Sequence, residues 1–114
     1  MATIKDVRDA ILTVDVPAFH FVAPEQKPDK FIIWGETAIG MVEDADDEPQ
    51  IARPRGQIYF YTSEEYDTVF VALVQALIDA GVGFSVSNIG RDFDLRLLTY
   101  QIDWEVDCGT GEIY

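Results

Sequence analysis

The sequence predicts an α+β domain in which two helices pack on a mixed or mainly antiparallel sheet of about five strands. Two stretches carry apolar residues at three- and four-residue steps, which is typical of helices with one buried face. Five other stretches are short and rich in aromatic and β-branched residues, which is typical of strands. These stretches follow one another in the order α-β-β-β-α-β-β, and residues 1–114 are expected to form a single domain.

The first helix is expected to begin after Thr3, whose hydroxyl can cap it, and to span about eleven residues. Its apolar face contains Ile4, Val7 and Ile11. Pro17 indicates the end of this region, because proline disfavours helical geometry in the residue before it. Strands are expected next at 18–22 and 31–34, with a proline-bounded loop between them.

No periodicity is visible in residues 40–56, so a long hairpin loop is expected there, either mobile or functional. An acid run and a small basic cluster lie in this loop and are the candidate contacts with other subunits or partners. They are Glu43, Asp44, Asp46, Asp47, Glu48, Arg53 and Arg55. A strand at 57–61 follows, and the loop most simply joins it to 31–34 as an antiparallel neighbour.

The strongest helical pattern lies between Thr62 and Gly83. Thr62 and Glu65 have the spacing of a capping box, and Gly81 can adopt the left-handed conformation that ends many helices. One apolar stripe comprises Tyr66, Val69, Phe70, Leu73, Val74, Leu77 and Ile78. This helix is therefore expected to form the main support of the sheet.

The remaining chain is predicted to form a half-buried strand at 84–89, a turn at 90–92 and a final strand at 93–106. Within the final strand the apolar residues change from odd to even positions at 97–98. Such a change predicts a bulge, a sharp bend or a strand that leaves one sheet for another. Residues 107–114 are expected to form a loose tail.

The net charge of −13, from 21 acidic and 8 basic residues, is the most unusual property of the composition. This charge opposes binding to nucleic-acid phosphates and to anionic lipid. Its simplest interpretation is solubility and self-repulsion, and the alternatives are an acidic lumen, a DNA-mimicking surface or a basic partner. No apolar run reaches the length of a membrane span, so we expect a soluble protein made in the cytoplasm, without membrane contact.

Metal-binding patterns in the sequence are weak. Asp44, Asp46 and Glu48 have the spacing that begins a calcium loop. The match then fails, because Pro49 stands where glycine is needed and Arg55 stands where glutamate is needed. We therefore expect no metal site and no cofactor.

Catalytic patterns are equally weak. His20 is the only histidine, and no local signature places a nucleophile beside it. Cys108 is the only cysteine, so it forms no internal disulfide, and it has no cationic neighbour in sequence to lower its pKa. Asp103 and Glu105 could form an acid pair for hydrolysis, but the simpler interpretation is the exposed side of a half-buried strand. We expect no catalytic residues.

Five segments in order carry a family resemblance: V-P-A-F-H-F (16–21), K-F-I-I-W-G-E (30–36), G-Q-I-Y-F-Y-T-S-E-E-Y-D (56–67), L-I-D-A-G-V-G-F (77–84) and Y-Q-I-D-W-E-V (100–106). Together they resemble small tail-completion, or tail-terminator, proteins of long-tailed bacteriophages and prophages, especially those of Gram-positive hosts. The resemblance runs from the first helix to Val106. It consists of fold-level signatures and contains no catalytic motif.

The resemblance implies a structural protein of the virion tail and neck, and not an enzyme. Members of the family form homo-oligomeric rings, commonly hexameric, at the head-proximal end of the tail tube. They stop tube growth and present a surface to the head–tail connector protein, so their partners are the tail tube protein and the connector. An acidic lumen would let DNA pass without specific binding.

A ring requires two different patches on each subunit in head-to-tail contact. Arg53 and Arg55 on one side, and the acids of 43–48 on the other, are the candidate pair. Three alternatives remain open at this point: a head-completion or connector protein, a small acidic inhibitor that mimics DNA, and a small hydrolase that uses His20.

Overall fold

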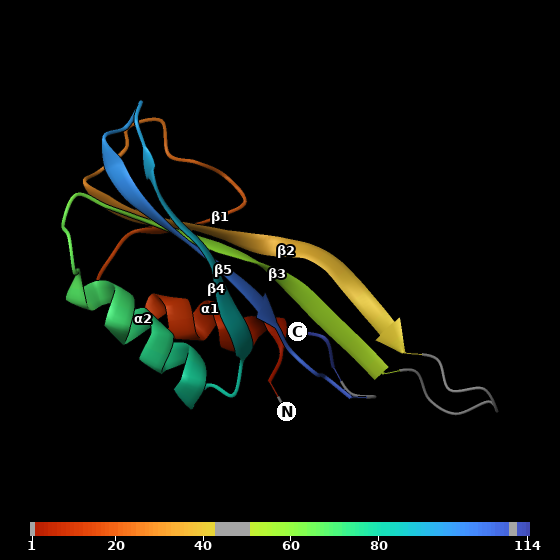
Figure 1. Ribbon diagram of the computed structural model, residues 1–114. Coiled ribbons are helices and arrows are strands. Elements are labelled where there is room, and N and C mark those ends of the chain that lie inside the picture. Colours follow the sequence, from red (N-terminus) through yellow and green to blue (C-terminus); the bar gives the residue numbers. More distant parts are fainter. Residues whose placement is uncertain (1, 43–50, 110–111) are drawn as a thin grey trace.

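A five-stranded sheet carries both helices on one of its faces (Figure 1). The computed structural model describes residues 2–42, 51–109 and 112–114. Its elements are α1 (Ile4–Leu12), β1 (Ala18–His20), β2 (Lys30–Val42), β3 (Ile51–Thr62), α2 (Thr68–Asp79), β4 (Gly83–Asp92) and β5 (Leu97–Glu105). The predicted α+β fold and its element order are therefore confirmed.

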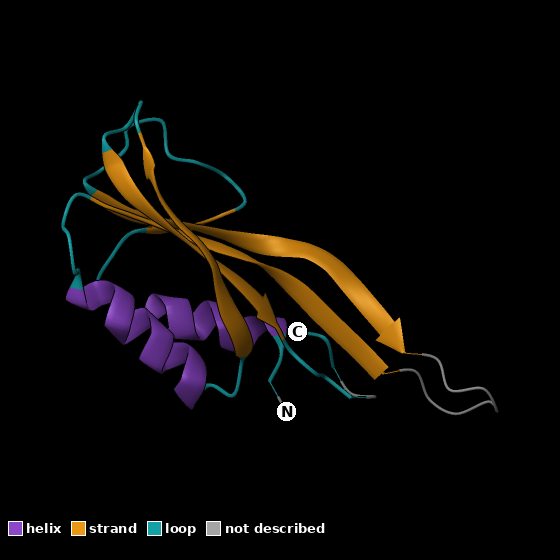
Figure 2. Ribbon diagram, viewed as in Figure 1, coloured by secondary structure: helices purple, strands orange, loops and turns teal. Residues whose placement is uncertain are grey.

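The strands lie in the order β1-β2-β3-β5-β4, so the sheet is mixed (Figure 2). Only β1 and β2 are parallel, and the other neighbours are antiparallel. The short strand β1 covers β2 only between Ile32 and Trp34. Strands β1 and β4 form the two opposite edges of the sheet.

The hydrophobic core lies between the helices and one face of the sheet. Even-numbered residues of β2, β3 and β5 face the helices because side chains alternate along a strand. They include Ile32, Trp34, Ile58, Phe60, Ile102 and Trp104. The helices contribute Val7, Ile11, Leu73 and Leu77, all fully buried. The opposite side of the sheet, here called the open face, has no helix over it among the described residues.

The strands around the expected loop are longer than the sequence indicates. Strand β2 continues to Val42 and β3 begins at Ile51, so the described parts of 40–56 are paired strands. The sequence hides this because the buried positions of β3 here hold Ala52, Pro54 and Gly56, which give little hydrophobic signal. The predicted acid run lies outside the described residues.

A two-stranded arm, residues 37–42 and 51–56, therefore projects from the body of the protein (Figure 1). A register shift between Glu36 and Ala38 marks its base, and extra residues of this kind bend a strand. The molecule measures 53 Å along its long axis and 25 Å and 22 Å across.

The predicted beginning of the second helix is wrong. Thr62 is the buried last residue of β3, and α2 begins only at Thr68. Asp67 caps the helix, because its Oδ1 accepts a hydrogen bond from the Val69 amide at 2.8 Å. The Thr62 hydroxyl donates to Oδ2 of Asp67 at 2.6 Å and so joins the strand to the cap.

The apolar stripe of α2 also differs from the prediction. Leu73 and Leu77 are fully buried as expected, but the side chain of Tyr66 lies in the preceding turn and is 93% exposed. Val71 and Ile78 are largely exposed too. The helix is therefore more apolar than its packing against the sheet requires.

The change of parity in the predicted final strand is a hairpin turn. Residues 93–96 connect β4 to β5, with Arg96 at a left-handed φ of 57°, and 90–92 belong to β4. The sheet has a bulge nearby, but it lies in β4 between Val86 and Asn88.

The end of the described chain packs against the body and is not the loose tail that was predicted. Cys108 is only 2% exposed, and its amide donates to the Ala52 carbonyl at 3.0 Å. The Ile4 amide donates to the carbonyl of Ile113 at 3.0 Å, which ties this segment to the start of α1. Helix α1 begins after Thr3 as expected, but it spans nine residues instead of about eleven. The 2.8 Å hydrogen bond at its start is donated by the Thr3 amide to Oδ2 of Asp6, whereas a cap by the Thr3 hydroxyl was predicted.

Candidate functional site

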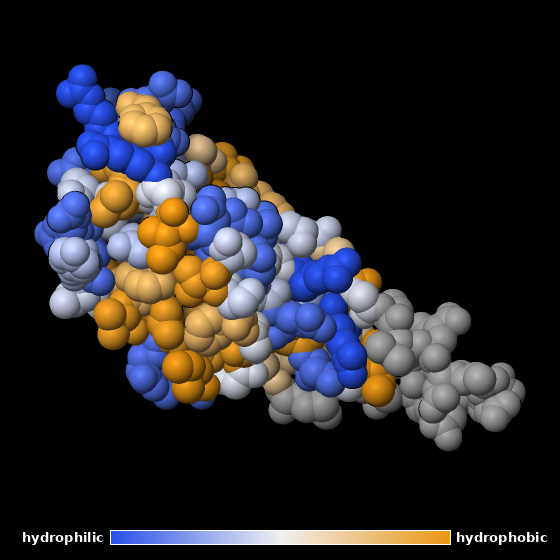
Figure 3. Space-filling model, viewed as in Figure 1, coloured by the Kyte–Doolittle hydropathy of each residue, from blue (hydrophilic) through white to orange (hydrophobic). Residues whose placement is uncertain are grey.

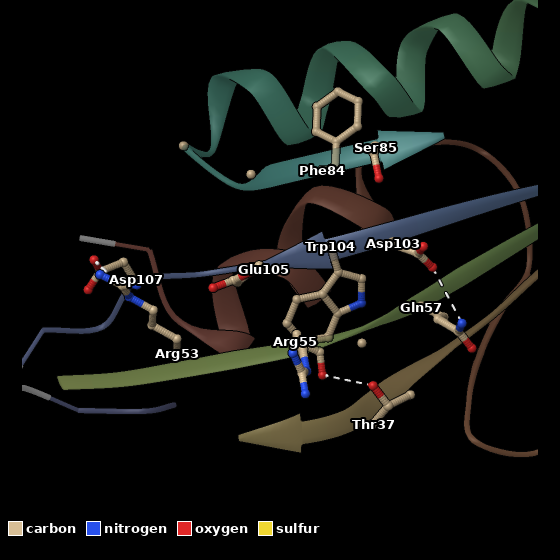
Figure 4. A pocket seen from close by; sticks show the side chains of 13 residues that line it. Thr37, Arg53, Arg55, Gln57, Phe84, Ser85, Asp103, Trp104, Glu105 and Asp107 are labelled. Atoms are coloured by element: carbon tan, nitrogen blue, oxygen red, sulfur yellow. Dashed lines mark hydrogen bonds and ion pairs between the residues drawn. The ribbon is translucent and has the colours of Figure 1, made fainter. Parts of the chain in front are cut away.

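A cavity of about 710 Å³ lies where the arm joins the body, and charged side chains of both signs line it (Figure 4). Strand β3 contributes Arg53 and Arg55. Strand β5 and the residues after it contribute Asp103, Glu105 and Asp107. We call this set of five residues the charged groove. Its formal charge of −1 contrasts with the −13 of the whole chain.

Strand pairing explains why these residues meet. In the antiparallel register of β3 and β5, Arg55 lies opposite Glu105 and Gln57 lies opposite Asp103. Odd-numbered positions of both strands face away from the helices, because the even-numbered positions fill the core. The pattern thus places a row of cations beside a row of anions on the open face.

One ion pair in the groove is formed within the chain. Nε of Arg53 lies 3.6 Å from Oδ2 of Asp107, and both side chains are about half exposed. Exposed pairs of this kind contribute about 0.2–1 kcal/mol, so Arg53 can exchange this partner for another at little cost. Arg55 makes no ion pair among the residues that the structure describes, although Glu105 is its neighbour across the strands.

A chain of polar side chains continues the groove along the open face. The Tyr59 hydroxyl donates to Oε1 of Gln57 at 2.8 Å. Nε2 of Gln57 and Nε2 of Gln101 approach Oδ1 of Asp103 at 3.4 and 3.3 Å. Asp103 is therefore already held by two amide donors.

Trp104 gives the groove its rigid base. A Cβ atom at Gly56 would lie 2.6 Å from Cζ2 of Trp104 and 2.0 Å from the Gly35 carbonyl oxygen, so only glycine fits at position 56. Among the described residues, Nε1 of Trp104 is the buried side-chain polar atom without a hydrogen-bond partner. Such an unpaired buried donor has a cost of about 1–3 kcal/mol.

The structure thus brings together part of the predicted site. Arg53 and Arg55 lie side by side on the open face, whereas Glu43, Asp44, Asp46, Asp47 and Glu48 lie outside the described residues. Sequence reasoning missed Asp107, which it had assigned to a loose tail. Its only sequence signal is that it continues the odd-numbered acids Asp103 and Glu105.

The residues that could carry nucleophilic catalysis are not assembled. His20 lies at the β1 edge, where its Nε2 is 2.8 Å from Oε2 of Glu36 and its ring stacks on Trp34. Ser85 lines the groove on β4, at the opposite edge of the sheet. Burial raises the pKa of Cys108, and Asp107 and Asp6 add to the shift, so its thiolate is disfavoured.

No group of three or more metal-binding side chains occurs in the part of the chain that the structure describes. In the same residues, no helix is both long enough and apolar enough to cross a membrane.

The chain was compared with known proteins. No protein-family model matches it, and no curated protein matches it.

Proposed function

We propose that this chain is a structural protein that closes the head-proximal end of a phage tail tube as a homo-oligomeric ring and forms part of the head–tail junction. The observation that carries the proposal is the arm. Its inner strand, 51–56, is paired with residues 104–109 of the same chain. Its outer strand, 37–42, has no second neighbour among the described residues, and Ile39 there is 42% exposed, which suits an element that packs on another subunit.

The edges of the sheet support the proposal. Beyond Trp34, the described part of β2 has no strand on its outer side, and β4 pairs only with β5. Exposed strand edges are sites of association unless a protein blocks them. A subunit with one open edge on each side can make the head-to-tail contacts that close a ring.

The charged groove supports it as well. It offers cations and anions in one place, so another acidic chain can approach it without the repulsion that the net charge of −13 otherwise causes. Arg53 and Arg55 can then pair with acids of a neighbouring subunit. This extends the contact expected from the sequence, because Glu105 and Asp107 can receive basic groups of a tube or connector protein in the same groove.

The test combines molar mass with imaging. The purified chain, alone and mixed with assembled tail tubes, is measured by light scattering and viewed by negative-stain electron microscopy. We expect closed rings that bind at one end of the tubes. A chain that stays monomeric and leaves the tube ends bare would contradict the proposal and favour the small acidic inhibitor.

A double variant tests the role of the groove. Arg53→Glu with Arg55→Glu should weaken ring formation, because it turns a mixed groove into a wholly acidic one. Lys5→Glu with Arg8→Glu is the matched control, since it makes the same change in net charge at exposed positions of α1. If both double variants lose ring formation equally, the effect comes from the total charge of the chain and the groove has no specific role.

A further inference from the structure

An uncharged apolar patch covers one edge of the molecule. It consists of Val71 and Ile78 on α2 and Val86 and Ile89 on β4, which are 40–66% exposed. We call it the α2–β4 patch. Figure 3 shows apolar side chains gathering over this helix and strand. Phe70 and Val74 lie half-buried on the same helix and extend the apolar surface toward the core.

The two segments that form the patch carry no charge. Residues 71–78 and 84–90 contain no acidic or basic side chain, whereas a quarter of the whole chain is charged. A basic partner would be attracted by acidic surface and would gain nothing from an uncharged one. An equally acidic partner is repelled by the acidic parts of the surface but not by this patch, and a second copy of this chain is such a partner.

A hollow at the opposite edge of the sheet matches the patch. This cavity of about 200 Å³ presents the apolar side chains of Phe21, Ile33 and Tyr59 on the open face, and Glu36, Thr37 and Gln57 also line it. We call it the β1–β2 hollow, and Val22 beside it is 68% exposed. Protruding aliphatic side chains at one edge and an apolar hollow at the other are the complementary surfaces that a head-to-tail contact needs.

The backbone at Phe21 supports a role for the hollow. Phe21 has a φ of 67°, a left-handed conformation that is unfavourable for a bulky residue, and its side chain is still 61% exposed. Its amide donates to the Trp34 carbonyl at 2.8 Å, and its ring covers Gly35, where a Cβ would lie 2.5 Å from it. The fold thus holds an exposed ring in a strained position, which is a feature found at binding sites.

We propose that copies of this chain associate head-to-tail, with the α2–β4 patch of one copy packed into the β1–β2 hollow of the next. The inference rests on the proposed ring and specifies its apolar contact. It assigns to this contact a surface that adjoins the charged groove at Thr37 and Gln57 but includes none of the groove's five charged residues. A closed ring then uses both edges of every subunit.

Each of two variants disrupts one of the two surfaces of the contact. Val71→Asp with Ile89→Asp places charges in the patch, and Phe21→Asp places one in the hollow. Aspartate tolerates left-handed φ better than phenylalanine does, so the second variant should fold. Each variant alone should raise the dissociation constant of self-association about thirtyfold or more, measured by sedimentation velocity. Leu12→Asp, at an equally exposed apolar position of α1, is the control and should associate like wild type.

Mixing the two variants decides the geometry. Each keeps the surface that the other has lost, so a head-to-tail contact predicts a one-to-one heterodimer of twice the mass of one chain. A two-fold contact of patch with patch predicts instead that Phe21→Asp associates normally and that mixing has no effect. That result would overturn the inference.

The remaining outcomes separate this inference from the proposed function. Rings that form equally well from both variants would overturn the inference and leave the proposed function standing. If each variant associates more weakly and the mixture forms the heterodimer, the contact is supported. If the wild-type rings then fail to bind tube ends, the proposed function is contradicted. A wild-type chain that shows no self-association up to about 1 mM would overturn the inference.

Discussion

The buried cap of α2 leads to a sharp prediction for stability. Asp67 is 3% exposed and accepts hydrogen bonds from the Val69 amide at 2.8 Å and the Thr62 hydroxyl at 2.6 Å. Nζ of Lys30 lies 3.0 Å from its Oδ2. Asp67 therefore joins α2, the end of β3 and the beginning of β2, and its removal should affect all three.

The size of the effect follows from these contacts. Asp67→Ala removes a helix cap, at a cost of about 1 kcal/mol. It also leaves the Thr62 hydroxyl buried without its acceptor, at a cost of about 1–3 kcal/mol. The free energy of unfolding should fall by about 2–4 kcal/mol in total. Asp67→Asn keeps an amide oxygen as cap and should cost clearly less than the alanine variant.

The pH dependence gives a second readout. Burial by itself raises the pKa of Asp67, but the hydrogen bonds from Thr62, Val69 and Lys30 outweigh it and lower the pKa below the ordinary 3.8. The charged form is thus favoured in the folded state. Its stabilisation is complete above pH 3.8 and is lost as the pH falls through the lowered value. The difference between wild type and Asp67→Asn should therefore shrink at low pH.

The assay is urea unfolding followed by the fluorescence of Trp34 and Trp104, both buried in the folded state. Measurements at pH 7 and pH 3 lie above and below pH 3.8, where the loss of the Asp67 contribution begins. Glu65→Ala is the control, because the sequence pattern places Glu65 in a cap whereas the structure leaves it exposed. An Asp67→Ala variant within about 0.5 kcal/mol of wild type, or a larger loss from Glu65→Ala, would refute this reasoning.

Three further substitutions or reactions test the packing. Gly56→Ala should destabilise by about 3 kcal/mol or more, because its Cβ would overlap the Gly35 carbonyl and Trp104; thermal unfolding checks this. Gly90→Ala, at a site with nothing within 4 Å of the new Cβ, should stay within about 0.5 kcal/mol of wild type, and an equal loss at both positions would contradict the packing argument. Cys108 should react with a thiol reagent at least about tenfold more slowly in the folded chain than in urea, since burial raises its pKa; rapid reaction of the native protein would show that its segment is not docked.

The sequence predicted the element order because its signals for helix and strand are local. The faces of α1 and the aromatic strand at 57–61 are visible in short windows of sequence. The N-terminus of α2 was misplaced because Thr62 and Glu65 imitate a capping box, whereas the real cap, Asp67, was counted only as a favourable charge. Tertiary contacts with Lys30 and Thr62 decide between the two, and these are invisible in the local pattern.

The candidate site was only half predictable for a related reason. Arg53 and Arg55 were identified as a basic cluster, but their partners lie about fifty residues away along the chain. Nothing in the sequence fixes the register that puts Arg55 opposite Glu105. Asp107 was assigned to a loose tail because a glycine-rich end resembles one, although the buried Cys108 beside it holds that segment in place.

The central position of β3 also constrains how the chain can fold during synthesis. Strand β3 can form a hairpin with β2 as soon as both have left the ribosome. Its other edge cannot pair until β5 has been synthesised. Leu98 of β5 lies 36 positions after its partner Thr62, and Glu105 lies 50 positions after its partner Arg55. Until then the aromatic run at 59–61 remains an open, aggregation-prone edge. A nascent chain halted before residue 97 should therefore stay unfolded or associate with chaperones, and the pairing of β5 should commit the whole domain to its native state in a single late step.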